Sequence, residues 1–215
     1  MKISLFYIEI FCFFFSASKN GFGLCFSCIL YTPRLYLLIG MRERLLGNQS
    51  TLLSFLLQQA ETRPKTPFLY IKNNNSYQGL SFETVLAEVA AFAQALENLG
   101  VASGDKVALM SYNRPEWVIA DLAILSLGAV TVPLYTNLSQ KELFFLLNDA
   151  EVKVAILENQ DMGTLLGDYK KHCTRLQNLI YIENESDDIA GLRFSTLTKD
   201  NTVESPSQVL SDRNN

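Results

Sequence analysis

The stretch that decides the fold is GDKVALMSYNRPEW, residues 104–117, which continues after three residues as DLAILSLGAVTVPLY, residues 121–135. Residues 107–110 are short, apolar and nearly continuous, which is typical of a strand covered on both faces. Residues 130–134 have the same character. Two such strands separated by a helix run parallel and are joined by a right-handed crossover.

The segment between these two strands carries the signals of a helix. Asn113 is a predicted N-cap, since its side chain can accept a free backbone N–H. Pro115 suits the first turn, and Glu116 favours the positive end of the helix dipole. We expect the helix to run to about Leu127, with Gly128 releasing the chain into the next strand.

The same alternation continues along the chain. Ser139 and Glu142 have the spacing of a capping box for a helix that ends near Asn148. The following predicted elements are a strand at residues 152–157, a helix around residues 162–169 and a strand at residues 179–182. This alternation predicts an α/β fold with a doubly wound, mainly parallel sheet and helices on both faces.

The residues before this unit predict three further elements. Ser50 is a predicted cap for a first helix. Residues 68–71 and 77–80 flank three asparagines and predict a small β-hairpin, because asparagine tolerates the left-handed backbone of tight turns. Ser81 then caps a long helix with apolar residues at three-and-four spacing, which we expect Gly100 to end.

Four blocks of this sequence occur together in the order and spacing of a known family. They are GDKVAL, NRPEW, LGAVTVPLY and VKVAILEN, at residues 104–109, 113–117, 127–135 and 152–159. The chain resembles the amino-terminal part of the AMP-forming acyl-CoA synthetases, the AMP-binding or adenylate-forming family. It looks most like the long-chain fatty acid–CoA ligases, over residues 50 to about 183.

The resemblance implies a ligase that activates a fatty acid with ATP and Mg²⁺ as an acyl-adenylate and then transfers it to coenzyme A. The family uses a Ser/Thr/Gly-rich phosphate loop ending in Pro-Lys-Gly and a late catalytic lysine. In this sequence the Pro-Lys pair is Pro64-Lys65, which follows Glu-Thr-Arg instead of a glycine-rich run. We therefore assign no catalytic, cofactor-binding or metal residue here and expect the chain alone to be inactive. The alternative function is a non-enzymatic remnant or a membrane-tethered interaction module.

Five residues that often carry chemistry have structural interpretations here. His172 lies beside two lysines, which favours a solvated side chain over a catalytic base. Trp117 is expected to be a core aromatic, with a place along an acyl channel as the alternative. We expect Arg114 and Glu116 to hold the helix entry, and the carboxylate of Asp105 to bond backbone in its own turn.

Charge and cysteine content exclude several classes of function. The 18 basic and 22 acidic residues give a formal charge of −4 without a basic stripe, which argues against nucleic-acid binding. Cys12, Cys25 and Cys28 lie in the apolar leader, and the body keeps only Cys173, so no disulfide framework is expected. Cys25 and Cys28 have CxxC spacing. They lack the βαβ context of a redox motif and the further ligands of a zinc site, which disfavours both kinds of site. A reducing, cytoplasmic compartment fits best.

Residues 1–40 form an apolar leader with the outline of a secretory signal. Three interpretations remain open: a non-native extension with Met41 as the true start, a membrane anchor that gives membrane association, and a secretion signal. Residues 41–183 are the predicted AMP-binding body. Residues 184–215 are polar and are expected to be poorly ordered. Because the body would leave a sheet edge open, we expect it to self-associate.

Overall fold

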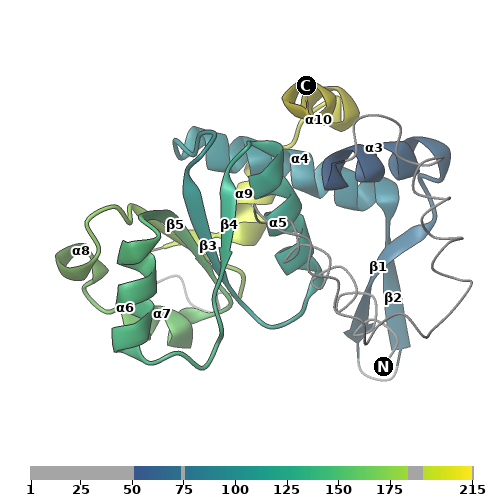
Figure 1. The fold of residues 1–215 in the computed structure, drawn as a ribbon. Coiled ribbons are helices and arrows are strands. Elements are labelled where there is room, and N and C mark those ends of the chain that lie inside the picture. The colour runs from purple at the N-terminus through teal and green to yellow at the C-terminus, as the bar shows by residue number, and fades with distance from the viewer. Residues whose placement is uncertain (1–50, 74–75, 184–190, 215) are drawn as a thin grey trace, which may run out of the picture. The chain divides into compact units, whose positions relative to one another are not determined.

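The computed structural model describes residues 51–73, 76–183 and 191–214, which all belong to the compact unit Leu46–Asn215 (Figure 1). The predictions for the leader at residues 1–40, including those for its cysteines, lie outside the described residues. So does the choice of Met41 as the start.

Five parallel strands form the main sheet. They are β3 (Lys106–Met110), β4 (Val130–Pro133), β5 (Val152–Leu157), β6 (Asn178–Tyr181) and β7 (Leu192–Arg193), in the order β4-β3-β5-β6-β7. The chain moves outward from β3 to β4, and then returns to the other side of β3 for β5. This reversal is the doubly wound arrangement, so the predicted fold class is confirmed.

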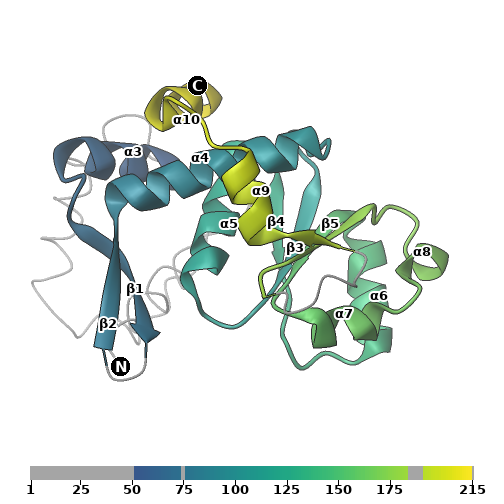
Figure 2. The same ribbon diagram turned by 180° about the vertical axis from the view of Figure 1, so that it is seen from behind.

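Helices cover both faces of this sheet (Figures 1 and 2). One face packs against α3 (Leu52–Thr62), α4 (Phe82–Asn98), α5 (Pro115–Ser126), α9 (Phe194–Asp200) and α10 (Pro206–Asn214). The other packs against α6 (Gln140–Asp149), α7 (Gln160–Leu166) and the residues around α8 (Tyr169–His172). Successive strand residues alternate between the two cores: Val107 and Leu109 face the first, Ala108 and Met110 the second.

Local capping signals explain most helix boundaries. The Ser81 hydroxyl accepts the N–H of Thr84 at the start of α4, and the backbone of Gly100 has φ +83° just after this helix. Ser139 and Glu142 form the predicted capping box of α6. At α3, however, the capping residue is Thr51 and not Ser50, because the Thr51 hydroxyl accepts the N–H of Ser54.

The predicted cap of α5 is also wrong. Arg114 is the N-cap, with extended backbone, and its side chain makes no capping hydrogen bond. Pro115 occupies the first helical position, where its missing N–H costs nothing. Asn113 consequently lies one residue outside the helix, too early to cap it.

The predicted helix around residues 162–169 is divided in two. Gly167, with φ +46°, ends α7, and the chain restarts as α8 two residues later. A non-glycine residue would be strained in this left-handed backbone.

The prediction of a poorly ordered tail is wrong for residues 191–214. β7 pairs parallel with β6, and the Phe194 ring packs 4.2 Å from the Phe92 ring, measured between centroids. Leu210 of α10 is fully buried. The tail is polar in composition, but its few apolar residues fall at positions that face α4, which is enough to order it. Residues 184–190 lie outside the described residues.

The predicted hairpin is present as β1 (Pro67–Asn73) and β2 (Ser76–Ser81), an antiparallel pair separate from the main sheet. Phe68 stacks on Phe82 with ring centroids 4.7 Å apart, which joins the base of the hairpin to the start of α4.

Candidate functional site

The carboxyl edge of the sheet, where β3 and β5 end side by side, is the first place to seek a site. In open doubly wound sheets, ligands bind outside the carboxyl ends of the strands at the point where strand order reverses. Here that point lies between β3 and β5. The residues that follow these strands are Ser111 to Arg114 after β3 and Glu158 after β5.

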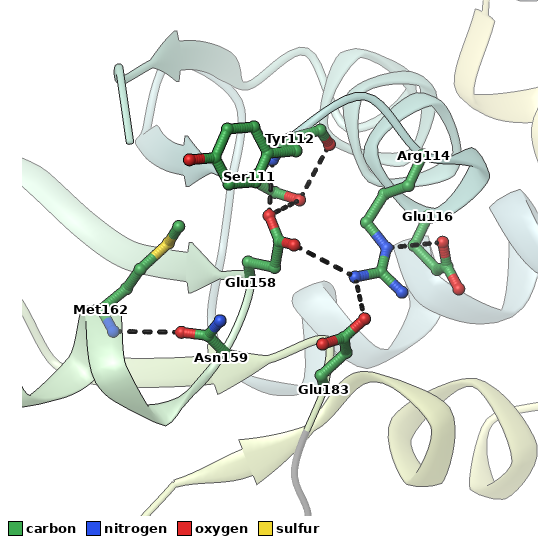
Figure 3. Close-up of polar contacts among 8 residues, drawn as sticks. All are labelled: Ser111, Tyr112, Arg114, Glu116, Glu158, Asn159, Met162 and Glu183. Carbon is green, nitrogen blue, oxygen red and sulfur yellow. Dashed lines mark hydrogen bonds and ion pairs between the residues drawn. The ribbon is translucent and has the colours of Figure 1, made fainter. Parts of the chain in front are cut away.

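Glu158 bridges the ends of the two strands. Its carboxylate Oε2 accepts the backbone N–H of Tyr112 at 2.6 Å and the hydroxyl of Ser111 at 3.1 Å (Figure 3). Its own N–H donates to the carbonyl of Met110 at 2.9 Å. The loop after β3 is therefore fixed to the end of β5 by charge-assisted hydrogen bonds.

Arg114 is surrounded by three carboxylates from different parts of the chain (Figure 3). Its Nε donates to Glu116 at 3.0 Å, and its Nη1 donates to Glu183 at 2.6 Å. The same Nη1 lies 3.7 Å from Glu158. Because Glu183 follows β6, Arg114 links the ends of three neighbouring strands. We call Arg114, Glu116, Glu158 and Glu183 the Arg114 cluster.

Burial and charge have opposite effects on the ionisation of this cluster. Burial lowers the pKa of Arg114, but hydrogen bonds from its guanidinium to Glu116 and Glu183 outweigh this effect, so the net pKa lies above its ordinary value. Nearby on α4, burial raises the pKa of Glu88, and the charge of Glu116 raises it further. Arg114 therefore stays charged, and the carboxylates around it outnumber it.

This arrangement holds the strand ends together. The carboxylates already accept hydrogen bonds or pair with Arg114, and a surplus of negative charge repels an anionic ligand such as a triphosphate. Among residues 51–73, 76–183 and 191–214, no group of three or more His, Cys, Asp or Glu side chains is placed to hold a metal ion.

The sequence predicted part of this cluster. Arg114 and Glu116 were expected to hold the helix entry, and they form an ion pair at the start of α5. Glu158 and Glu183 were missed. Their positions in the sequence could have revealed them. Glu158 directly follows the buried strand β5, Glu183 comes two residues after the end of β6, and the carboxyl ends of parallel strands lie at one edge of the sheet.

The other sequence candidates lie elsewhere. His172 is exposed on α8, where its ring stacks on Phe144 with centroids 4.7 Å apart. Trp117 is partly buried against the core of α3, α4 and α5. Cys173 is a buried free thiol, and burial raises its pKa.

Asp105 stands at the opposite, amino edge of the sheet. Its Oδ2 accepts a hydrogen bond from the N–H of Ala102 at 2.9 Å, which is the predicted bond to backbone in its own turn. It also accepts one from the Nζ of Lys153 at 2.7 Å. The hydrogen bond from Lys153, followed by that from Ala102, lowers the pKa of Asp105. Lys153 was not predicted, and it joins the starts of β3 and β5.

A shallow hollow of about 560 Å³ lies near this amino edge. It is lined by the ends of α4 and α5 and by Arg213 of α10, with Glu97 and Gly128 among the lining residues. Two helix C-termini line it, and the carboxylate of Glu97 is already paired with the guanidinium of Arg213 at 2.7 Å. Because doubly wound sheets bind ligands at the carboxyl edge, this hollow is not the candidate site.

The fold is a doubly wound α/β unit. At its carboxyl edge, where the strand order reverses, the ion pairs of the Arg114 cluster occupy the place where such folds bind ligands. The sequence profile described as "AMP-binding enzyme" matches residues 56–211. The chain therefore belongs to the AMP-binding enzyme family, and the match extends past residue 183, where the sequence had placed the end of the body.

Several relatives found in comparison are named as long-chain fatty acid–CoA ligases or acyl-CoA synthetases. A long-chain fatty acid–CoA ligase from Mycobacterium bovis is 36% identical over 95 residues, 44% of this chain and 16% of the ligase. Long chain acyl-CoA synthetase 8 from Arabidopsis thaliana is 28% identical over 168 residues, 78% of this chain and 22% of the synthetase. The chain thus spans less than a quarter of the length of either relative.

Solved structures agree on the fold. Acetoacetyl-CoA synthetase from Streptomyces lividans superposes with a TM-score of 0.60 at 24% identity, covering 68% of this chain and 24% of the synthetase.

Within the part of the chain that the structure describes, no helix is both long and apolar enough to span a bilayer.

Proposed function

We propose that this chain is the amino-terminal part of an ATP-dependent, AMP-forming long-chain fatty acyl-CoA synthetase. The complete enzyme activates a fatty acid as an acyl-adenylate and passes the acyl group to coenzyme A. The observation that carries the proposal is the family match over residues 56–211 together with relatives that are long-chain ligases. Fatty acid, ATP, Mg²⁺ and coenzyme A are the ligands of that complete enzyme.

The chain by itself is inactive in this proposal. The printed sequence has no glycine-rich phosphate loop ending in Pro-Lys-Gly. The cationic group at the strand-reversal point is Arg114, and its guanidinium is already paired with carboxylates. No described group at this edge is therefore placed to neutralise a triphosphate, which phosphoryl chemistry requires.

In this proposal the Arg114 cluster has a positioning role. It ties the ends of β3, β5 and β6 together, so it fixes the positions of the residues that follow these strands at the carboxyl edge. Arg114 acts on the arrangement of this edge and not on the substrate.

Exchange of radiolabelled pyrophosphate into ATP tests the proposed inactivity. The purified full chain, incubated with ATP, Mg²⁺ and fatty acids of several lengths, should show no exchange above a no-protein control. A complete long-chain ligase measured in parallel shows that the assay works. Exchange that depends on both the chain and a fatty acid would refute the assignment of activity to the missing segments.

A second candidate is a non-enzymatic or membrane-tethered module that keeps this lobe, and the missing phosphate loop favours it. We propose a cytoplasmic location for the body, because ATP and coenzyme A, the ligands of the complete enzyme, are found there. Membrane association through residues 1–40 is tested by deleting them: loss of membrane fractionation with an unchanged circular dichroism spectrum would support an anchor.

A further inference from the structure

The β1–β2 hairpin stands apart from the main sheet. Among the described residues, each of its strands pairs only with the other, and Figures 1 and 2 show the hairpin extending away from the five-stranded sheet. A two-stranded hairpin is marginally stable alone in water. It is held at its base, where Phe68, Leu69 and Leu80 pack against the core.

The free part of the hairpin has an aromatic face. The register pairs Tyr70 with Gly79 and Lys72 with Tyr77, so these four residues share one face. Tyr70 is 47% exposed and Tyr77 is 62% exposed. A Cβ on Gly79 would lie 3.3 Å from Cε1 of Tyr70, so the Tyr70 ring lies across this glycine. Two exposed tyrosines accompanied by one charge form an amphipathic surface that suits a partner.

The outer edge of β1 suits the addition of another strand. In a strand with one neighbour, every second residue directs its N–H and C=O groups away from that neighbour. Proteins usually protect such edges with charges or prolines. β1 has a proline at its first residue, Pro67, and a charge near its other end, Lys72. The residues between them, FLYI, are rich in strand-forming residues and carry neither protection.

We propose that this edge of β1, with the Tyr70–Tyr77 face, is the docking surface for an apolar β-strand from the remaining part of a long-chain fatty acid–CoA ligase. The inference rests on the proposed function. Because the chain spans 16% and 22% of its ligase relatives, most of such an enzyme lies outside it. The partner strand supplies backbone hydrogen bonds to β1 and apolar side chains to the tyrosines.

Hydrogen exchange of the backbone amides tests this docking surface. One sample is the full chain, and the other is a chimera in which residues 51–214 replace the matching region of the Arabidopsis thaliana synthetase, whose match covers 168 residues. The β1 amides that do not pair with β2 should exchange at least about tenfold more slowly in the chimera. Amides of β3, which are central in the sheet, serve as the internal reference.

Matched variants distinguish loss of the docking surface from a general loss of stability. The double variant Tyr70→Thr/Tyr77→Thr keeps strand-forming residues, so it should leave the isolated chain folded and remove most of the protection in the chimera. Tyr135→Thr is the control, because Tyr135 is 80% exposed and lies outside the hairpin. Equal protection in both variants would overturn the role of the tyrosine face.

The full chain alone gives a result even if the chimera does not fold. Protection of the outer β1 amides that grows with protein concentration would mean that a second copy covers the edge. Protection independent of concentration would mean that the chain covers it itself. Either result overturns the proposal. A chimera that forms acyl-CoA with β1 unprotected refutes the docking surface alone, whereas an inactive chimera with β1 protected counts against the proposed function alone.

Discussion

Replacing Arg114 by methionine removes the guanidinium from the three carboxylates and keeps most of the aliphatic stem. The side chain of Arg114 is 21% exposed and that of Glu158 only 13%, so Glu158 loses its nearby cation in a poorly solvated place. The bond to Glu183 contributes less, because Glu183 is 52% exposed and such pairs are worth about 0–1 kcal/mol.

The expected loss follows from these exposures. A hydrogen bond to a charged group contributes about 1.5–3 kcal/mol when it is partly buried, which applies to the Arg114–Glu116 bond. Allowing for exposure, we expect Arg114→Met to lower the free energy of unfolding by about 2 kcal/mol, which corresponds to a fall in Tm of about 4–8 °C. Urea unfolding at pH 7 measures the first quantity and calorimetry the second.

Two companion variants make the reasoning refutable. Glu183→Gln should cost about 0.5 kcal/mol, because it removes only the exposed partner. In a Glu158→Gln background, Arg114→Met should cost clearly less than in the natural chain, since no poorly solvated carboxylate then loses its nearby cation. A cost for Arg114→Met below about 0.5 kcal/mol, or one unchanged by Glu158→Gln, would show that the cluster does not hold the strand ends.

Three further predictions concern other parts of the chain. Because Lys153 and Ala102 lower the pKa of Asp105, its ionised form stabilises the fold above the ordinary carboxyl pKa, and this stabilisation is lost as the pH falls through the lower folded value. Asp105→Asn should therefore destabilise the chain more at pH 7 than at acid pH, as judged by urea midpoints; an equal difference at both pH values contradicts this. Gly163→Ala should cost about 1–3 kcal/mol in thermal unfolding, because its Cβ would clash with the buried Tyr181 hydroxyl, and unaltered stability would disprove this packing. Since β4 is an edge strand with Val130 47% exposed, we expect the full chain to self-associate in sedimentation measurements, and a strictly monomeric sample at high concentration would refute this.

Local signals in the sequence predicted the helices and strands well. Helix boundaries depend on residues that interact with nearby backbone groups, such as Ser81, Gly100 and Ser139. A few consecutive residues are therefore enough to predict them. Asn113 misled the prediction because Pro115 takes the first helical position and shifts the cap to Arg114. The polar tail misled it because Leu210 is buried by a helix more than a hundred residues earlier in the chain.

The candidate site was predictable only where its residues are close in sequence. Arg114 and Glu116 are two residues apart, and their pairing was expected. Glu183 is 69 residues from Arg114, so the contact depends on the strand order β3-β5-β6, which alternation of elements alone does not determine. Both Glu158 and Glu183 follow buried parallel strands, and this alone would have predicted that they lie at one edge of the sheet. It would not have predicted that both lie close to the guanidinium of Arg114.

The most direct test of the central claim is acyl-CoA synthesis by the chimera that carries residues 51–214 in the Arabidopsis thaliana synthetase. If the chain is the amino-terminal part of such an enzyme, the folded chimera should form acyl-CoA from a long-chain fatty acid, ATP and coenzyme A, and Arg114→Met should reduce that activity. A folded chimera that binds ATP but forms neither acyl-adenylate nor acyl-CoA would contradict the account.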